Sequence, residues 1–328
     1  MGKKIILIIL ILALIVSGVI FVRQQNKKLA VDEDIAGTSE HAEKEQTSLF
    51  YEDREYPLKH HITSLLVLGT DKFEGQLYHG DIDLFYNESC ADFQTVLVID
   101  DDEKAIYAIP VNRDTVTAVP WLDVLGNIGG YVEQQIALAY TYGSGKKDSA
   151  ENDALAVSKF LYDAPIDYVM AFTMDSVPII NDAVGGVEVT IETDLTGADP
   201  SFKKGETLTL MGDKALTFVR ARMNVGDESN LQRMGRFKQY LYGFIVSARR
   251  TYNKNPDSAL KILEKVSPYL TMNMTAEKLS EITKKLAQYE LKPFKSIDGE
   301  VKINEYAEFY ADDESKWNAV KDVYCIGS

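Results

Sequence analysis

The apolar pattern of the chain opens with an uninterrupted run at residues 5–22, IILIILILALIVSGVIFV, which carries no charge. As a helix rising about 1.5 Å per residue, this run would extend roughly 27 Å, close to the bilayer's hydrocarbon core of about 30 Å. We therefore predict a transmembrane helix behind a cytoplasmic head, residues 1–4. A cleaved signal peptide is the alternative, but the run exceeds a typical signal core and no small-x-small cleavage pattern follows it.

Residues 23–58 have the opposite character, being polar and acidic with few large apolar side chains. A stretch of this kind cannot bury enough apolar surface to fold. We predict an acidic extracellular tether here. A short basic head before a large domain favours a single-pass protein in the cell membrane, with its soluble domain on the cell-wall side.

From residue 59 to residue 250, short apolar runs of strand length alternate with longer segments of helical spacing. Strands are predicted at 63–71, 95–100, 105–112, 167–173 and 187–192, and helices at 149–163, 175–184, 212–222 and 231–250. The turn DDEK between the second and third strands is typical of an antiparallel hairpin. The alternation predicts one α/β domain with helices layered on a sheet.

Beyond residue 250, helical spacing recurs at about 257–268 and 275–290, before a mixed and acidic tail. We predict a C-terminal helical extension over 251–328, packed on the domain or following it. Nothing in its pattern assigns it a function.

The net charge of −15 argues against nucleic acid as a partner, because no basic face dominates. Cys90 and Cys325 are the only cysteines, which is neither a disulfide framework nor a metal cluster. They would either pair in an exported domain or remain two thiols. The four histidines lack metal-ligand spacing and are interpreted as surface residues.

The arginines occupy unusual positions. Each lies at the end of an apolar element or near the start of the next one: Arg113 in VNRDT, Arg220 and Arg222 in FVRAR, and Arg233 and Arg236 one helical turn apart. Guanidinium groups present forks of donors that match phosphate oxygens. A single arginine of this kind usually pairs with a surface carboxylate, but the set predicts a site for a multivalent anion such as pyrophosphate.

Two acids have comparable positions. Asp71 follows a predicted buried strand and Asp92 precedes the next one. Carboxylates at neighbouring strand ends suit Mg²⁺, whose remaining ligands can be substrate phosphates; the alternative is that each aspartate only forms a turn. Asp114 is expected to orient Arg113. The sequence contains no nucleophilic triad, no phosphate-cradling glycine-rich loop and no zinc spacing.

Taken in order, these segments resemble the LytR-CpsA-Psr (LCP) family of cell-wall glycopolymer ligases, from about residue 64 to residue 250. The resemblance is carried by the ordered series LLVLGTD, ADFQTVLVID, NRDT, QQIALAYTYG, PIDYVMAFTMDSV, DAVGGVEV and LMGDKALTFVRAR. The step from Asp92 to Arg113 also agrees with the family's spacing.

The resemblance implies a central mixed β-sheet with helices on both sides, enclosing an apolar slot for a lipid tail. It implies a phosphotransferase that moves a glycopolymer from a polyprenyl-pyrophosphate carrier to peptidoglycan, through a phosphodiester on the C6 hydroxyl of N-acetylmuramic acid. Mg²⁺, with Mn²⁺ as its substitute, would sit on Asp71 and Asp92. Arg113, Asp92 and Arg220 would be catalytic. The pyrophosphate would be held by Arg113, Arg220, Arg222, Arg233, Arg236 and Gln239.

The chain departs from the family pattern at the expected site. Cys90 stands where an arginine is usual, Phe93 replaces a threonine, and Phe237 and Lys238 replace a pair of glutamines. Two other functions therefore remain open. One is a binding or scaffolding protein for polyprenyl phosphates without catalysis, and the other is a lipid pyrophosphatase with water as acceptor.

Overall fold

The computed structural model describes residues 46–71, 78–79, 85–221, 225, 230–255 and 265–327. The predicted head and anchor, and most of the predicted tether, lie outside these residues. Among the helices that are described, none is both long enough and apolar enough to cross a membrane.

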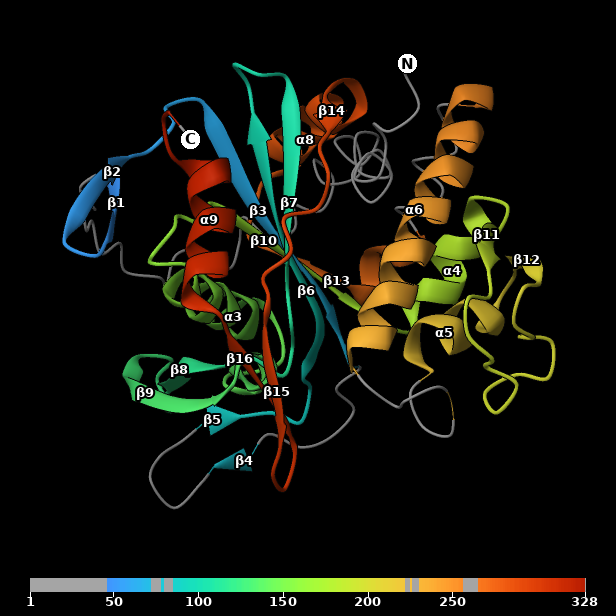
Figure 1. Cartoon of the computed structure of the whole chain (residues 1–328), viewed down its shortest axis with the longest axis horizontal. Helices are drawn as coiled ribbons and strands as arrows, with labels where there is room; N and C mark the ends of the chain where they lie inside the picture. The colour runs from blue at the N-terminus through green and yellow to red at the C-terminus, as the bar shows by residue number, and fades with distance from the viewer. Residues whose placement is uncertain are drawn as a thin grey trace, which may run out of the picture.

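A six-stranded mixed sheet forms the centre of the molecule (Figure 1). Its strands lie in the order β13-β10-β3-β6-β7-β14. The middle pairs β3–β6 and β6–β7 are antiparallel, whereas β10 runs parallel to β3 and β14 parallel to β7. The predicted hairpin around DDEK is confirmed as β6–β7. The strand bounds are β3 (Ile62–Thr70), β6 (Ala91–Asp100), β7 (Ala105–Val111), β10 (Tyr168–Thr173), β13 (Leu270–Met272) and β14 (Glu290–Leu291).

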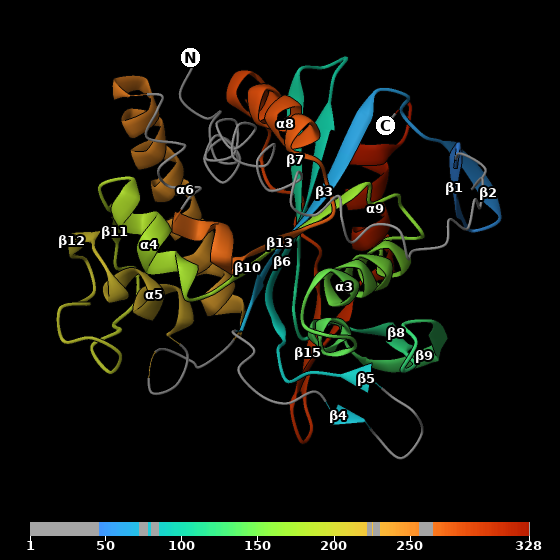
Figure 2. The ribbon, with the colours of Figure 1, turned by 180° about the vertical axis from the view of Figure 1, so that it is seen from behind.

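Both faces of the sheet are buried, which explains why its central strands are apolar throughout. Alternate residues of a strand point to opposite faces, so Leu65 and Val67 enter one core while Leu66 and Leu68 enter the other. The first core is covered by α4 (Ser176–Ala183), α5 (Asp213–Arg220), α6 (Asn230–Lys254) and α8 (Ala276–Gln288). The second is covered by η3 (Ile136–Thr141), α3 (Lys147–Phe160) and α9 (Asp313–Tyr324). The predicted layering is confirmed, as Figures 1 and 2 show.

Short two-stranded sheets and 3₁₀ turns surround this centre. The predicted strand at 187–192 is β11, but it pairs with β12 beside α6 and does not join the central sheet. The remaining elements are β1 (Ser48–Tyr51), β2 (Arg54–Pro57), β4 (Tyr78–His79), β5 (Phe85–Tyr86), β8 (Val116–Leu122), β9 (Ile128–Gln135), β11 (Val187–Thr190), β12 (Thr207–Leu210), η4 (Ser267–Tyr269), β15 (Gly299–Ile303) and β16 (Ala307–Ala311).

The N-terminal boundary of the folded part differs from the prediction. The predicted tether reaches residue 58, but β1 and β2 form a hairpin within it. Leu49 is fully buried, and Tyr51 stacks on Trp317 of α9 at 4.6 Å between ring centroids. Four residues per strand are too few to show an apolar pattern against acidic neighbours. The hairpin therefore belongs to the folded part.

The C-terminal region is also different from the helical extension predicted over 251–328. Its strands β13 and β14 are the two edges of the central sheet, and α9 covers the second core. The predicted helix at 275–290 is confirmed as α8, whereas most of the segment 257–268 lies outside the described residues. Cys325 follows α9, and it forms no disulfide with Cys90. The C-terminal region is therefore an integral part of the domain.

Candidate active site

Three strand ends meet at one end of the central sheet. Because β6 is antiparallel to both β3 and β7, the start of β6 lies beside the ends of its two neighbours. Asp71 follows β3, Asp92 is the second residue of β6, and Arg113 comes shortly after β7. The Asp71 amide also donates to the Cys90 carbonyl at 3.2 Å. The topology thus brings together three residues that the sequence separates by up to 42 positions.

Asp92 lies between two arginines. One of its carboxylate oxygens accepts a hydrogen bond from Nη1 of Arg113, and the other is 3.5 Å from Nη1 of Arg233 in the first turn of α6. All three side chains are mostly buried, with exposures of 12% for Asp92, 19% for Arg113 and 12% for Arg233. Ion pairs with little access to solvent are screened less than surface pairs. Asp92 therefore holds both guanidinium groups in place.

The turn after β7 presents Arg113 to this site. The Asn112 side chain accepts a hydrogen bond from the Asp114 amide at 3.0 Å, an Asx turn that fixes the backbone around Arg113. Asp114 Oδ1 lies 3.4 Å from Nε of Arg113. The expectation that Asp114 orients Arg113 agrees with this contact.

Arg220 approaches from the opposite side, at the C-terminus of α5. The last turn of a helix favours a cation, and Arg220 pairs with Asp71. Both side chains are more open to solvent than the Asp92 group, at 44% and 38% exposed. A charged ligand can therefore reach Arg220 more readily than it can reach Arg233.

Two predicted substrate-binding residues have other roles in this conformation, and a third lies outside the described residues. Arg236 is buried and donates to the Ala221 carbonyl, which ties α6 to the end of α5. Gln239 donates to the Thr190 carbonyl of β11 at 2.7 Å. At about 100° per residue, Gln239 is rotated roughly 240° around α6 from Arg233, so it faces away from the anion site. Arg222 belongs to the residues that the structure does not describe.

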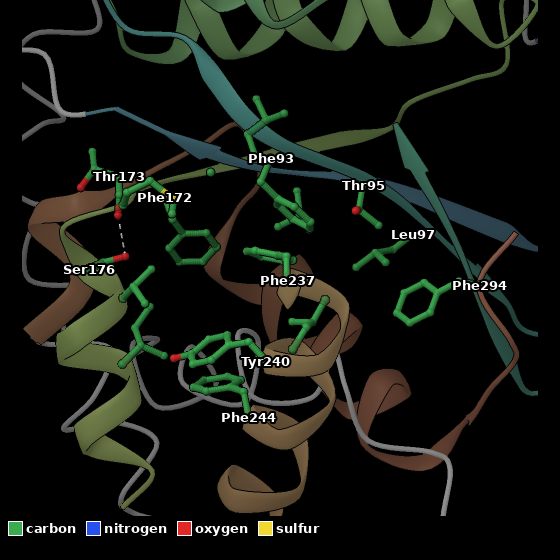
Figure 3. A pocket seen from close by; sticks show the side chains of 17 residues that line it. Phe93, Thr95, Leu97, Phe172, Thr173, Ser176, Phe237, Tyr240, Phe244 and Phe294 are labelled. Atoms are coloured by element: carbon green, nitrogen blue, oxygen red, sulfur yellow. Dashed lines mark hydrogen bonds between the residues drawn. The ribbon is translucent and has the colours of Figure 1, made fainter. Parts of the chain in front are cut away.

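Two adjacent cavities lie at the site. The first, called here the arginine cavity, has an empty volume of ≈ 610 Å³ and is lined by Asp92, Arg113, Arg220 and Arg233. The second, the apolar slot, has an empty volume of ≈ 890 Å³ and runs between the sheet and helices α4 and α6 (Figure 3). The two cavities share the wall residues Phe93, Thr95, Met174, Phe237, Leu241 and Phe294.

Phe93 and Phe237 line both cavities. Phe93 projects from β6 and Phe237 from α6, and their rings face each other across the slot in Figure 3. The ring centroids are 3.9 Å apart with an interplanar angle of 26°, which is a stacked pair. At both positions the pattern of the family described in the sequence analysis has a polar residue. In the structure they extend the apolar lining up to the arginine cavity.

A buried acid that the sequence analysis did not single out lies beneath this region. Asp153 of α3 has no exposed surface, and its nearest described polar partner is Nε2 of Gln94 at 3.5 Å. Burial raises the pKa of its carboxyl well above the ordinary value. The burial of Asp153 could have been predicted from the sequence. Asp153 precedes Ala156 and Val157 by one helical turn, so it shares their buried face.

Asp153→Asn is expected to make the protein more stable at pH 7. The folded state keeps the Asp153 proton where the unfolded chain has lost it, so the contribution of Asp153 to the unfolding free energy falls as pH rises above about 4. An amide of the same shape has no proton to lose. We expect a clear gain in the unfolding free energy at pH 7, and a much smaller gain near pH 3, where the unfolded chain also keeps the proton.

Urea titrations from pH 3 to pH 8 would measure this effect, with the exposed Asp175→Asn as the control for the same chemical change. If the stability difference between Asp153→Asn and the parent were the same at pH 3 and at pH 8, the assignment would be contradicted.

Cys90 is a poor candidate for a nucleophile. Burial raises the pKa of its thiol, and the nearby Arg113 offsets only part of that effect. A buried thiol of this kind stays protonated near neutral pH and reacts slowly.

The carboxylates of Asp71 and Asp92 are suitable ligands for Mg²⁺. They are two hard oxygen donors at adjacent strand ends, and Mg²⁺ is commonly bound by one or two carboxylates with substrate phosphates and water as the other ligands. Within the described part of the chain, no group of three or more His, Cys, Asp or Glu could hold a metal ion without such a substrate. Each aspartate now pairs with an arginine.

Comparison with known proteins gives one family. The model of the LytR_cpsA_psr family matches residues 19–323. The teichoic acid transferase TagU of Bacillus cereus (strain AH820), described as polyisoprenyl-teichoic acid–peptidoglycan teichoic acid transferase, is 29% identical over 182 residues, 56% of this chain and 51% of that protein. The TagU of Bacillus licheniformis is 27% identical over 259 residues, 77% of this chain and 74% of that protein. The chain thus spans about half the length of the first of these relatives.

Solved structures share the fold. TagT bound to LI-WTA has a TM-score of 0.59 and 19% identity, over 80% of this chain and 89% of that one. Protein gbs0355 of Streptococcus agalactiae has a TM-score of 0.62 and 19% identity, over 80% of this chain and 87% of that one. At these identities the likeness concerns the fold alone. The family match extends well past residue 250, in agreement with the C-terminal strands of the central sheet.

Proposed function

The chain belongs to the LytR_cpsA_psr family, and on this premise we propose that it transfers a glycopolymer from a polyprenyl-pyrophosphate carrier to peptidoglycan. The observation that supports the proposal best is that the two cavities are adjacent and share wall residues. A cluster of cations lies next to an apolar slot, which matches a ligand whose pyrophosphate is joined to an isoprenoid chain. The names of the TagU relatives agree with this substrate class.

The proposed ligand would compete for one ion pair of the site, the one between Arg220 and Asp71. Arg220 and Asp71 are partly exposed, so a phosphate oxygen can compete for this arginine. Arg113 and Arg233 are held by Asp92 with their forks at the edge of the arginine cavity. Preorganised cations of this kind stabilise the charge that develops during phosphoryl transfer. Asp92 then acts by positioning the two arginines.

In the proposed reaction an acceptor hydroxyl oxygen bonds to the polymer-side phosphorus. The bond from that phosphorus to the bridging oxygen breaks, lipid monophosphate leaves, and the hydroxyl proton passes to solvent or to the leaving phosphate. On peptidoglycan the acceptor would be the C6 hydroxyl of N-acetylmuramic acid. Mg²⁺ on Asp71 and Asp92 would neutralise phosphate charge and orient its oxygens.

The proposed location follows from the carrier. A polyprenyl chain stays in the bilayer, so its enzyme must work at the membrane surface. The apolar run at residues 5–22 would supply the anchor, with the domain on the cell-wall side.

A binding role without transfer is the second candidate, and the Phe93–Phe237 stack is the observation that favours it. The family's polar groups are absent at these two positions, which leaves fewer hydrogen bonds to a transition state. The same site with water as acceptor would make a lipid pyrophosphatase.

One assay separates the three functions. The full chain in detergent would be incubated with a synthetic polyprenyl-pyrophosphate oligosaccharide, Mg²⁺ and peptidoglycan fragments, and the products analysed by mass spectrometry. A sugar–phosphate–peptidoglycan adduct is expected. Lipid monophosphate and sugar phosphate without an adduct would indicate the hydrolase, and carrier binding without any product would leave only the binding role. A heat-denatured sample is the control for spontaneous hydrolysis.

A further inference from the structure

A second groove adjoins the arginine cavity, away from the apolar slot. Its empty volume is ≈ 690 Å³, and it shares Pro110, Met234 and Lys238 with the arginine cavity. It has no lining residue in common with the slot. Through Ser296 and Asp298 it continues into an open hollow of ≈ 780 Å³ beside α9. The groove and hollow together are called here the side groove.

The C-terminal region builds the outer wall of the side groove. The chain from residue 292 to residue 298 runs along the free half of β7, where the amides of Lys292 and Lys295 donate to the carbonyls of Ile106 and Ala108, each at 2.9 Å. At Pro110 the groove begins. The Phe309 amide then donates to the Asp114 carbonyl at 2.8 Å, next to Arg113. The wall is therefore anchored to the same turn that presents Arg113.

The lining suits an uncharged, hydroxyl-rich ligand. Thr115 lines the groove, and its hydroxyl is fully buried without a hydrogen-bond partner among the described residues. The Lys238 ammonium reaches Ser296 at 3.2 Å, and both side chains line the groove. Hydroxyl and ammonium groups of this kind can form hydrogen bonds with the hydroxyls of sugars.

Charge argues against a phosphate-rich chain in the side groove. Its far end carries Asp298, Asp312 and Glu314, and of the two lysines that line it, Lys295 is paired with Asp322 at 2.6 Å. A polyanion would be repelled there, whereas a neutral glycan would not.

The geometry of phosphoryl transfer indicates from which side the acceptor enters. The attacking and leaving oxygens lie roughly in line through phosphorus. If the lipid phosphate departs toward the apolar slot, the acceptor must enter the arginine cavity from another side, and the side groove opens there. We propose that the side groove binds the acceptor, a neutral N-acetylated glycan strand. This inference rests on the proposed function, since it presumes that the arginine cavity holds the lipid pyrophosphate.

Ser296→Trp is the variant that tests it. Ser296 is exposed and belongs to both parts of the side groove, so an indole ring there blocks the passage without disturbing the core. Lys204→Trp, in an exposed turn before β12, is the control for an added ring. The probe is the β-1,4-linked tetramer of N-acetylglucosamine, titrated into the full chain in detergent and followed by calorimetry.

We expect the parent and Lys204→Trp to bind the tetramer, and Ser296→Trp to bind it at least tenfold more weakly. A glycerol phosphate oligomer of similar length should not compete. Equal tetramer affinity in Ser296→Trp and the parent, no tetramer binding by the parent, or effective competition by the oligomer would each overturn the inference.

Farnesyl pyrophosphate serves as the separate probe of the arginine cavity. Its affinity is expected to be the same in Ser296→Trp and in the parent. If the parent does not bind it, the proposed function fails. If it binds normally while the tetramer results are negative, only the assignment of the side groove fails.

Discussion

Replacing Arg113 with alanine is expected to lower transfer about 100- to 1,000-fold, the range seen when one preorganised donor to a developing oxyanion is removed. Arg113 is mostly buried, and both Asp92 and Asp114 contact it. Its loss removes a cation from the arginine cavity and leaves Asp92 with one guanidinium contact in place of two. Arg220→Ala should have a comparable effect on turnover, since it removes the cation on the Asp71 side.

The assay is the mass-spectrometric measurement of the adduct at saturating carrier. Arg250→Ala is the matched control, because Arg250 is an exposed arginine near the other end of α6. Arg113→Lys is informative as well: a lysine keeps the charge but not the fork of donors, so it should restore only part of the activity. Parental rates in both Arg113→Ala and Arg220→Ala, with unchanged circular dichroism, would refute the pyrophosphate site.

Trp317→Ala is expected to lower the unfolding free energy by about 3–5 kcal/mol, the usual cost of truncating a buried tryptophan. Trp317 is 4% exposed. Its ring stacks on Tyr51 with centroids 4.6 Å apart, and meets Tyr56 and Tyr162 edge-on at 4.7 and 5.3 Å. Truncation would therefore loosen three attachments at once, those of the N-terminal hairpin, the end of α3 and α9.

Guanidinium titrations followed by near-ultraviolet circular dichroism would measure this loss. Tyr306→Ala is the control, because Tyr306 is 69% exposed between β15 and β16 and its replacement should change stability by less than about 0.5 kcal/mol. A Trp317→Ala protein with the parental midpoint would show that the hairpin and α9 add nothing to the domain.

Phe93 and Phe237 depart from the family pattern, and in the structure they do more than remove polar groups. Phe93 and Phe237 remove hydrogen-bonding groups, yet together they continue the apolar slot to the mouth of the arginine cavity. Stacked aromatic pairs contribute about 0.5–1.5 kcal/mol beyond burial. Under the proposed function, a lipid chain that passes between these rings would have to separate them, so the pair would affect how a carrier enters as well as how it is held.

The central strands and most of the helices could be predicted from the sequence, because a sheet buried on both faces requires continuous apolar runs. The edge strands could not. β13 has three half-buried residues and β14 has two residues, and so short a segment carries no period. Their strand form comes from backbone hydrogen bonds to β10 and β7. The same holds for the hairpin of β1 and β2, whose burial depends on Trp317, more than 260 positions away.

For the site, the sequence by itself determined the chemistry, namely cations at element ends, two carboxylates at strand ends, and the order of motifs that indicates the family. Only the tertiary structure decided which of these groups meet. It joined Asp92 to Arg113 and Arg233, paired Asp71 with Arg220, and turned Gln239 toward β11. The physical reason is that residue type sets what a side chain can bind, whereas strand order and the rotation of α6 set where it points.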